Sequence, residues 1–200
     1  MHAARSRMLL SSLAISFVVG LGMWPAPAAA AAGPYADDAD LRTPVGAAVA
    51  ALVGPDPAVA LAVLPADFEA KMGYRPALVD GTPTDPAGDC SSPVPLPGRF
   101  EEPCKVHDFG YDLLRLAAGN GTPLGGWARV ALDRMLGDRM HQTCSNPVCD
   151  WAADLAYTGV AFNTWRQRDS APVAKESTTA IIASTFVRGG DEIMVLAGLR

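Results

Sequence analysis

The chain has 200 residues, with 16 basic and 21 acidic side chains and a formal net charge of −5. This acidic balance argues against general nucleic-acid affinity and against strong electrostatic attachment to anionic membranes. If an N-terminal targeting segment is removed, the remaining residues are enough for one domain with a modest core. We therefore expect no nucleic-acid partner.

The first 32 residues have the organisation of a secretory signal peptide. Basic residues near the start precede the uncharged, mostly apolar run 8–23, and the small-residue region 25–32 follows. The apolar run is shorter than the ~20 residues of a spanning helix, which disfavours the competing interpretation as a membrane anchor. We expect cleavage within residues 30–32 and secretion of the remainder.

Four cysteines fall in the part expected to be exported: Cys90, Cys104, Cys144 and Cys149. An even number of cysteines in an oxidising compartment predicts two disulfides. A zinc site is the rival interpretation. The spacings do not form a pair of short Cys-x-x-Cys knuckles, and exported thiols tend to oxidise, so we favour disulfides.

Residues 33–75 form a predicted N-terminal helical extension. Thr43 and Pro44 are a good helix opening, because a capping hydroxyl precedes a proline at the first helical position. Two further short helices are expected over residues 57–64 and 66–72.

Residues 75–99 are rich in proline and glycine, a composition that predicts a loop and not a helix. This loop carries Asp80, Asp85 and Asp89, the last of them directly before Cys90.

Three longer helices are expected over residues 101–118, 126–143 and 149–168. Their lengths and short links predict packed antiparallel helices, and hence an all-α, disulfide-linked bundle. The tail, residues 169–200, is ambiguous. Its β-branched content permits a hairpin, whereas the Gly-Gly pair within it would also separate two helices. We favour helices for the tail.

The first long helix and the second each carry chemically active residues on one face. Side chains three and four positions apart share a face, which groups Cys104, His107 and Tyr111 on one helix and Asp133 and Cys144 on the other. If the helices pack antiparallel with these faces together, Asp133 reaches His107. Asp133 would then hold one imidazole nitrogen protonated while the other takes a proton from water.

Asp108 faces a different direction from His107, because adjacent helical residues point about 100° apart. That direction is where the loop carrying Asp89 would approach. Two carboxylates with loop carbonyls and water are a hard-oxygen set, which suits Ca²⁺ better than zinc. A cation held there would stabilise an oxyanion forming on an ester carbonyl.

Each of these residues also has a simpler interpretation. A lone helical histidine is more often a packing residue than a catalyst. Asp133 and Asp138 are most simply exposed carboxylates beside arginines, Asp108 a helix-dipole partner, and Asp89 a turn residue. The combination of a cysteine, a His-Asp pair, and a downstream aspartate and cysteine on one stripe favours the catalytic interpretation.

The segment Cys104-Lys-Val-His-Asp-Phe-Gly-Tyr111 resembles the active-site helix of secreted phospholipase A2, and more closely its prokaryotic branch. The animal enzymes have a cysteine where Gly110 stands, whereas the bacterial branch has this glycine. The resemblance covers roughly residues 85–165. It implies a mainly helical fold, a catalytic domain over residues 76–168, Ca²⁺ dependence and hydrolysis of the sn-2 ester of glycerophospholipids.

The resemblance also implies roles for individual residues. His107 matches the general base and Asp133 the aspartate that orients it. Asp108 and Asp89 match the two calcium-binding aspartates. The implied disulfides are Cys90–Cys104 and Cys144–Cys149.

Two departures from the family pattern concern the site. In the bacterial branch the loop aspartate lies two places before the cysteine, whereas Asp89 lies directly before Cys90. The link over residues 120–126 is longer than in the family pattern, which leaves Asp138 as the alternative to Asp133.

From sequence we therefore predict a secreted, monomeric, calcium-dependent phospholipase A2 that acts on a phospholipid membrane or micelle surface. The alternative from another class is a catalytically silent protein on the same scaffold that binds lipid or another protein. A general secreted esterase is disfavoured because no Gly-x-Ser-x-Gly nucleophile elbow is present.

Overall fold

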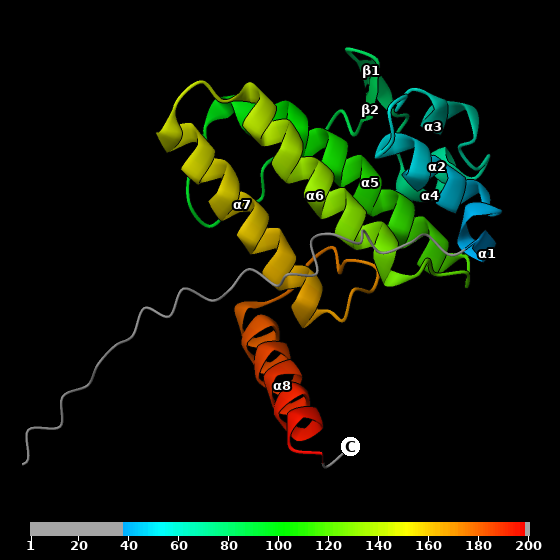
Figure 1. The fold of residues 1–200 in the computed structure, drawn as a ribbon. Coiled ribbons are helices and arrows are strands. Elements are labelled where there is room, and N and C mark those ends of the chain that lie inside the picture. The colour runs from blue at the N-terminus through cyan, green and yellow to red at the C-terminus, as the bar shows by residue number, and fades with distance from the viewer. Residues whose placement is uncertain (1–37, 199–200) are drawn as a thin grey trace, which may run out of the picture. The chain divides into compact units, whose positions relative to one another are not determined.

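The computed structural model describes residues 38–198, and the predicted signal peptide, residues 1–32, lies outside the described residues. The described part contains eight α-helices, one short 3₁₀ helix and one two-stranded sheet (Figure 1), so the predicted mainly helical class is confirmed. The elements are α1 (Asp38–Leu41), α2 (Pro44–Leu52), α3 (Val59–Ala62), α4 (Phe68–Met72), β1 (Ala77–Val79), β2 (Thr82–Thr84), η2 (Gly98–Phe100), α5 (Glu101–Gly119), α6 (Gly126–Thr143), α7 (Pro147–Arg166) and α8 (Thr178–Leu196).

Helix α2 begins as its sequence predicts. The Thr43 hydroxyl accepts a hydrogen bond from the Gly46 N–H at 3.0 Å, and Pro44 occupies the first turn. The buried face of α2 joins the same hydrophobic core as α5 and α6, and Val49 and Leu52 are fully buried in it. The N-terminal helices therefore cover one side of the long helices.

A β-hairpin lies inside the segment that was predicted to be loop throughout, so that part of the prediction is wrong. Strands β1 and β2 pair antiparallel, with Ala77 opposite Thr84 and Val79 opposite Thr82. The turn residues Asp80 (φ 47°) and Gly81 (φ 75°) both have positive φ, the conformation of the two-residue Asp-Gly turn that suits a hairpin. The hairpin was missed because the high proline content of residues 75–99 predicted a loop and the Asp80-Gly81 turn is only two residues long.

Helices α5 and α6 lie side by side and antiparallel, as predicted (Figure 1). Near the start of α5, Arg99 donates to the carbonyl of Thr143 at the end of α6. Gly110 permits the close approach in the middle, because a Cβ atom there would lie 2.4 Å from the Leu132 side chain. Helix α7 packs on α6, and a Cβ atom on Gly137 would lie 3.4 Å from Tyr157.

Two disulfides link the segments around these helices, with the predicted pairing. Cys90–Cys104 joins the proline-rich loop to the first turn of α5, with a Cα–Cα distance of 5.2 Å. Cys144–Cys149 joins the end of α6 to the start of α7, with a Cα–Cα distance of 5.4 Å. The part of the chain that the structure describes has no free cysteine, so the zinc interpretation is wrong for these four residues.

The tail contains a single helix, so the hairpin alternative is wrong. The preference for helical structure is confirmed, although one helix forms in place of two. The predicted interruption at Gly189–Gly190 is absent, because α8 runs through both glycines. Helix α8 contacts α7 through Arg188, which donates to the Trp165 carbonyl and lies 5.8 Å from the Trp165 ring centroid. Over the described residues, no helix combines the length and the apolar character needed to cross a membrane.

Removal of the two disulfides should destabilise the protein unequally. The sequence separations are 14 and 5 residues, so loop-closure entropy predicts a loss of about 3 kcal/mol for Cys90→Ser with Cys104→Ser and about 2 kcal/mol for Cys144→Ser with Cys149→Ser. Urea unfolding of the protein measures both losses. A larger loss from the shorter loop would contradict this ranking.

Candidate active site

His107 lies on the buried side of α5, where the predicted stripe puts it. Its side chain is 5% exposed, and its Nε2 atom lies 3.0 Å from Oδ1 of Asp133 on α6. A carboxylate oxygen only accepts hydrogen bonds, so the neutral imidazole carries its proton on Nε2. The other ring nitrogen, Nδ1, is then the one able to accept a proton.

Asp133 is the most highly connected buried polar side chain around His107. It is 2% exposed and accepts a hydrogen bond from the Tyr111 hydroxyl at 2.7 Å and from the Thr164 hydroxyl at 2.5 Å. With His107, three side chains from α5 and α7 therefore donate to one carboxylate on α6. The simpler interpretation of Asp133 as an exposed carboxylate is wrong, whereas the alternative residue Asp138 is exposed.

Tyr111 both donates to Asp133 and supports the imidazole. Its ring centroid lies 3.9 Å from that of His107. Burial, and next the charge of Asp133, raise the pKa of the Tyr111 hydroxyl. The hydroxyl therefore stays protonated at neutral pH and can act only as a donor to the carboxylate.

Two buried residues of this cluster were not found from the sequence. Thr164 belongs to α7, and no local pattern connects it to Asp133, which lies 31 positions earlier. Arg129 lies one helical turn before Asp133, and its Cζ atom is 5.2 Å from the Tyr111 ring centroid. The only indication in the sequence that Arg129 belongs to this cluster is its i, i+4 spacing from Asp133, which puts both residues on one face of α6.

Asp108 meets the proline-rich loop, as expected, but through the loop backbone. The Asp89 N–H donates to Oδ2 of Asp108 at 3.0 Å, while the Asp89 carboxylate accepts from the Ser91 hydroxyl at 3.1 Å. The chain passes so close that a Cβ atom on Gly88 would lie 2.8 Å from Oδ2 of Asp108. Loop and helix are thus in direct contact where a cation was predicted.

The electrostatics at Asp108 favour a nearby positive charge. Burial is the main cause that raises the pKa of Asp108 to about 6, and the Asp85 carboxylate adds to it. A cation beside Asp108 would reverse this shift by stabilising the charged carboxylate.

The oxygen atoms around Asp108 fit calcium only if backbone carbonyls contribute as ligands together with side chains. Among the described residues, no three histidine, cysteine or acidic side chains converge as a metal site. Calcium accepts carboxylate, backbone carbonyl and water oxygens together, so a site here would combine Asp108 with oxygens of residues 85–90. An all-side-chain cage of the zinc type does not fit.

Comparisons of the chain with protein-family models, with curated proteins and with solved structures find no match.

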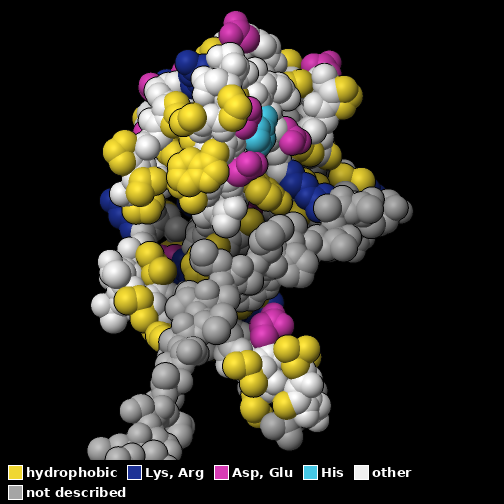
Figure 2. Space-filling view, turned by 60° about the vertical axis from the view of Figure 1, so that its left-hand side comes forward, with side chains coloured by type: hydrophobic (Ala, Val, Ile, Leu, Met, Phe, Trp, Pro, Cys, Tyr) yellow, Lys and Arg dark blue, Asp and Glu magenta, His cyan; other side chains and the backbone are white. Residues whose placement is uncertain are grey.

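Helix α7 also exposes a hydrophobic surface. Val148 is 76% exposed and Trp151 is 65% exposed, and Leu155 and Phe162 continue the same stripe along the helix. Figure 2 shows hydrophobic side chains gathered on one face of the molecule next to acidic side chains and a histidine. This stripe lies on the side of α7 opposite Thr164, so it is a surface separate from the Asp133 cluster.

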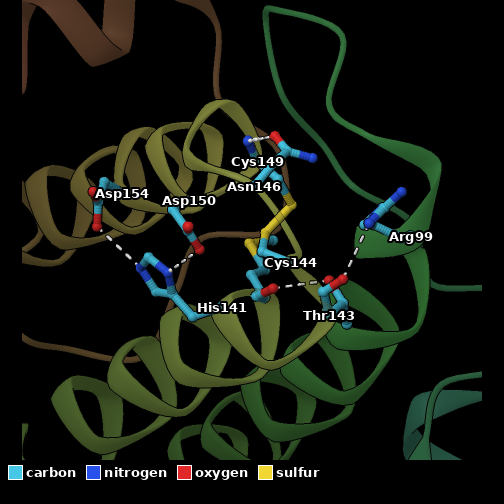
Figure 3. The surroundings of a disulfide bond; sticks show 9 residues. Arg99, His141, Thr143, Cys144, Asn146, Cys149, Asp150 and Asp154 are labelled. Atoms are coloured by element: carbon cyan, nitrogen blue, oxygen red, sulfur yellow. Dashed lines mark hydrogen bonds and ion pairs between the residues drawn. A yellow bond between two sulfur atoms is a disulfide. The ribbon is translucent and has the colours of Figure 1, made fainter.

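A second histidine bridges α6 and α7 beside the disulfide Cys144–Cys149 (Figure 3). His141 Nδ1 lies 3.2 Å from Oδ1 of Asp150, and its Nε2 lies 3.0 Å from Oδ1 of Asp154. Both ring nitrogens face acceptors, so only the doubly protonated imidazolium donates to both. The hydrogen bond to Asp150, more than the one to Asp154, raises the pKa of His141.

This bridge should make stability depend on pH. Because the folded-state pKa of His141 is raised, its contribution is complete below the unfolded value of about 6.5 and is lost as the pH rises through the folded value. Urea unfolding at pH 5.5 and pH 9 should therefore show His141→Gln losing more stability, relative to the parent protein, at pH 5.5. An equal loss at both pH values would rule out a protonated bridge.

Proposed function

We propose that this protein is a calcium-dependent, phospholipase A2-like hydrolase of the sn-2 ester of glycerophospholipids, with lysophospholipid and fatty acid as products. The observation that carries the proposal is the buried hydrogen bond between His107 and Asp133 across α5 and α6. The motif that resembles the active-site helix of that family supports it, because the motif supplies this same histidine.

The proposed reaction begins with water at the Nδ1 side of His107. Asp133 keeps the proton on Nε2, so Nδ1 accepts a proton from the water as its oxygen attacks the ester carbonyl. The tetrahedral intermediate then expels the alcohol oxygen of the lysophospholipid. The protonated His107 returns its proton to this leaving group, which restores the neutral imidazole.

Asp108 and Asp89, with backbone oxygens of the loop, would hold the calcium ion. When bound, calcium supplies positive charge beside the carbonyl oxygen that becomes negative during attack. The disulfide Cys90–Cys104 keeps the loop against α5, and Gly88 permits the close contact with Asp108. The contribution of the chain is therefore a loop that is already positioned next to the helix carrying His107.

Export and contact with a lipid surface belong to the same proposal. The signal peptide predicted over residues 1–32 and the two disulfides support secretion. We propose that the secreted protein is a monomer. The exposed stripe of Val148, Trp151, Leu155 and Phe162 supports contact with an apolar partner, because an exposed tryptophan among aliphatic side chains suits a membrane or micelle surface.

A catalytically silent lipid- or protein-binding protein on this scaffold is the second candidate. Two observations favour it. The Asp89 carboxylate is turned to Ser91, and Gly88 stands two places before Cys90, where the bacterial family has its loop aspartate. The two candidates differ in turnover and not in lipid contact.

Fatty acid release from phosphatidylcholine liposomes tests the proposed activity. The mature protein should release fatty acid in the presence of calcium and lose that activity in EDTA. His107→Ala should reduce release by about 100- to 10,000-fold, because removal of a general base costs a factor of this order.

His141→Ala is the matched control, since it removes the other described histidine, which lies on the exposed side of α6. Its release should stay close to that of the folded parent protein, because its ring nitrogens face Asp150 and Asp154 and not the His107–Asp133 pair. Absence of calcium-dependent release by the parent protein would leave the silent binding protein as the function.

A further inference from the structure

Arg129 is a fully buried arginine on α6, one turn before Asp133. It is 1% exposed. Its Nη1 atom donates to Oε1 of Gln167 and to the carbonyl of Ser170, both at 2.7 Å. Its Nε and Nη2 atoms have no hydrogen-bond partner within residues 38–198. Burial of a cation in this way is unfavourable unless another interaction compensates it.

Glu176, the acidic group that interacts electrostatically with Arg129, is already ion-paired with Arg166. Among the described residues, no carboxylate lies within ion-pair distance of Arg129. A further compensating contact is the Tyr111 ring, whose centroid lies 5.2 Å from Cζ of Arg129, a distance suited to a cation–π interaction.

Tyr111 connects this buried cation to the His107–Asp133 pair. Its hydroxyl donates to Oδ1 of Asp133 at 2.7 Å, and its ring lies 3.9 Å from the imidazole. One aromatic side chain thus contacts the guanidinium, the carboxylate and the imidazole. Arg115 approaches the same ring at 5.9 Å, but its charge is balanced by Asp112.

We propose that Arg129 is a positioning residue for the His107–Asp133 pair, acting through Tyr111. Its guanidinium holds the Tyr111 ring so that the hydroxyl donates to Asp133. The proposal rests on the function proposed above for this pair. Arg129 touches neither of the two residues directly and has no assigned contact with substrate.

A double-mutant cycle in the calcium-loaded protein tests this role through turnover. Arg129→Met, which replaces the cation by an apolar chain of similar length, should lower kcat about ten-fold with KM unchanged. If Arg129 acts through Tyr111, then Arg129→Met should have little further effect in a Tyr111→Phe background. Independent, multiplying effects of the two substitutions would contradict the proposal.

Arg166→Met is the matched control. Arg166 is also buried, at 4% exposure, and also has one nitrogen, Nε, without a partner, but it pairs with Glu176 and has no assigned contact with Tyr111. Its effect on kcat should multiply with that of Tyr111→Phe, because Arg166 does not contact the Tyr111 ring and reaches Arg129 only through Glu176 and Gln167. Coupling of Arg166 as strong as that of Arg129 would mean that any buried arginine has this effect.

The ring N–H proton resonance of His107 gives a second measurement that needs no turnover and no calcium. Arg129→Met and Tyr111→Phe should both shift it downfield, because Asp133 loses the Tyr111 donor and the His107 hydrogen bond shortens. Arg129→Lys, which retains the charge, and Arg166→Met should leave it in place.

If Arg129→Met does not fold, Arg129→Gln, which also removes the charge, replaces it in both measurements. An unchanged resonance after loss of the Arg129 charge would overturn the positioning role. The parent protein could also show no phospholipase activity while the substitutions still shift the resonance as expected. That result would contradict the proposed function but not the positioning role of Arg129.

Discussion

The buried carboxylate of Asp133 is the group on which the described arrangement depends. It is almost fully removed from water, and it accepts hydrogen bonds from a histidine, a tyrosine and a threonine. A carboxylate buried without partners would strongly oppose folding, so α5, α6 and α7 must pack closely enough for these donors to reach it. The same packing fixes the imidazole of His107 in one orientation with its proton on the side facing Asp133. Packing and proposed chemistry therefore have a common physical origin.

The order of the helices also follows from close contact at particular residues. Gly110 lets Leu132 approach α5, and Tyr157 of α7 packs over Gly137 of α6. The disulfide Cys144–Cys149 then links the end of α6 to the start of α7, and Cys90–Cys104 links the loop to α5. These contacts keep His107 and Thr164 at different oxygens of one carboxylate, and they bring the Asp89 backbone to Asp108.

Much of the fold and part of the site could be predicted because the signals are local. The Thr43 cap, the spans of the long helices and the stripe of Cys104, His107 and Tyr111 depend only on residues within a few turns. The hairpin was missed because its two-residue turn is short and lies among prolines, and α8 continues through a glycine pair that favours a break. Thr164 and Arg129 could not be assigned because no motif connects Thr164 to Asp133, 31 positions away, or Arg129 to Gln167 and Ser170, 38 and 41 positions away. The Asp89 carboxylate is turned to Ser91, a side-chain choice that spacing alone does not determine.

Substitution of Asp133 by asparagine most directly tests whether this buried carboxylate organises a catalytic histidine. The amide keeps the shape of the side chain but removes its charge, and its NH₂ group can face His107, which favours the tautomer with the proton on Nδ1. Calcium-dependent fatty acid release should then fall by at least about 100-fold, while the helical circular dichroism of the protein is retained. Release equal to that of the parent protein by a folded Asp133→Asn variant would contradict the proposed role of Asp133 in orienting His107.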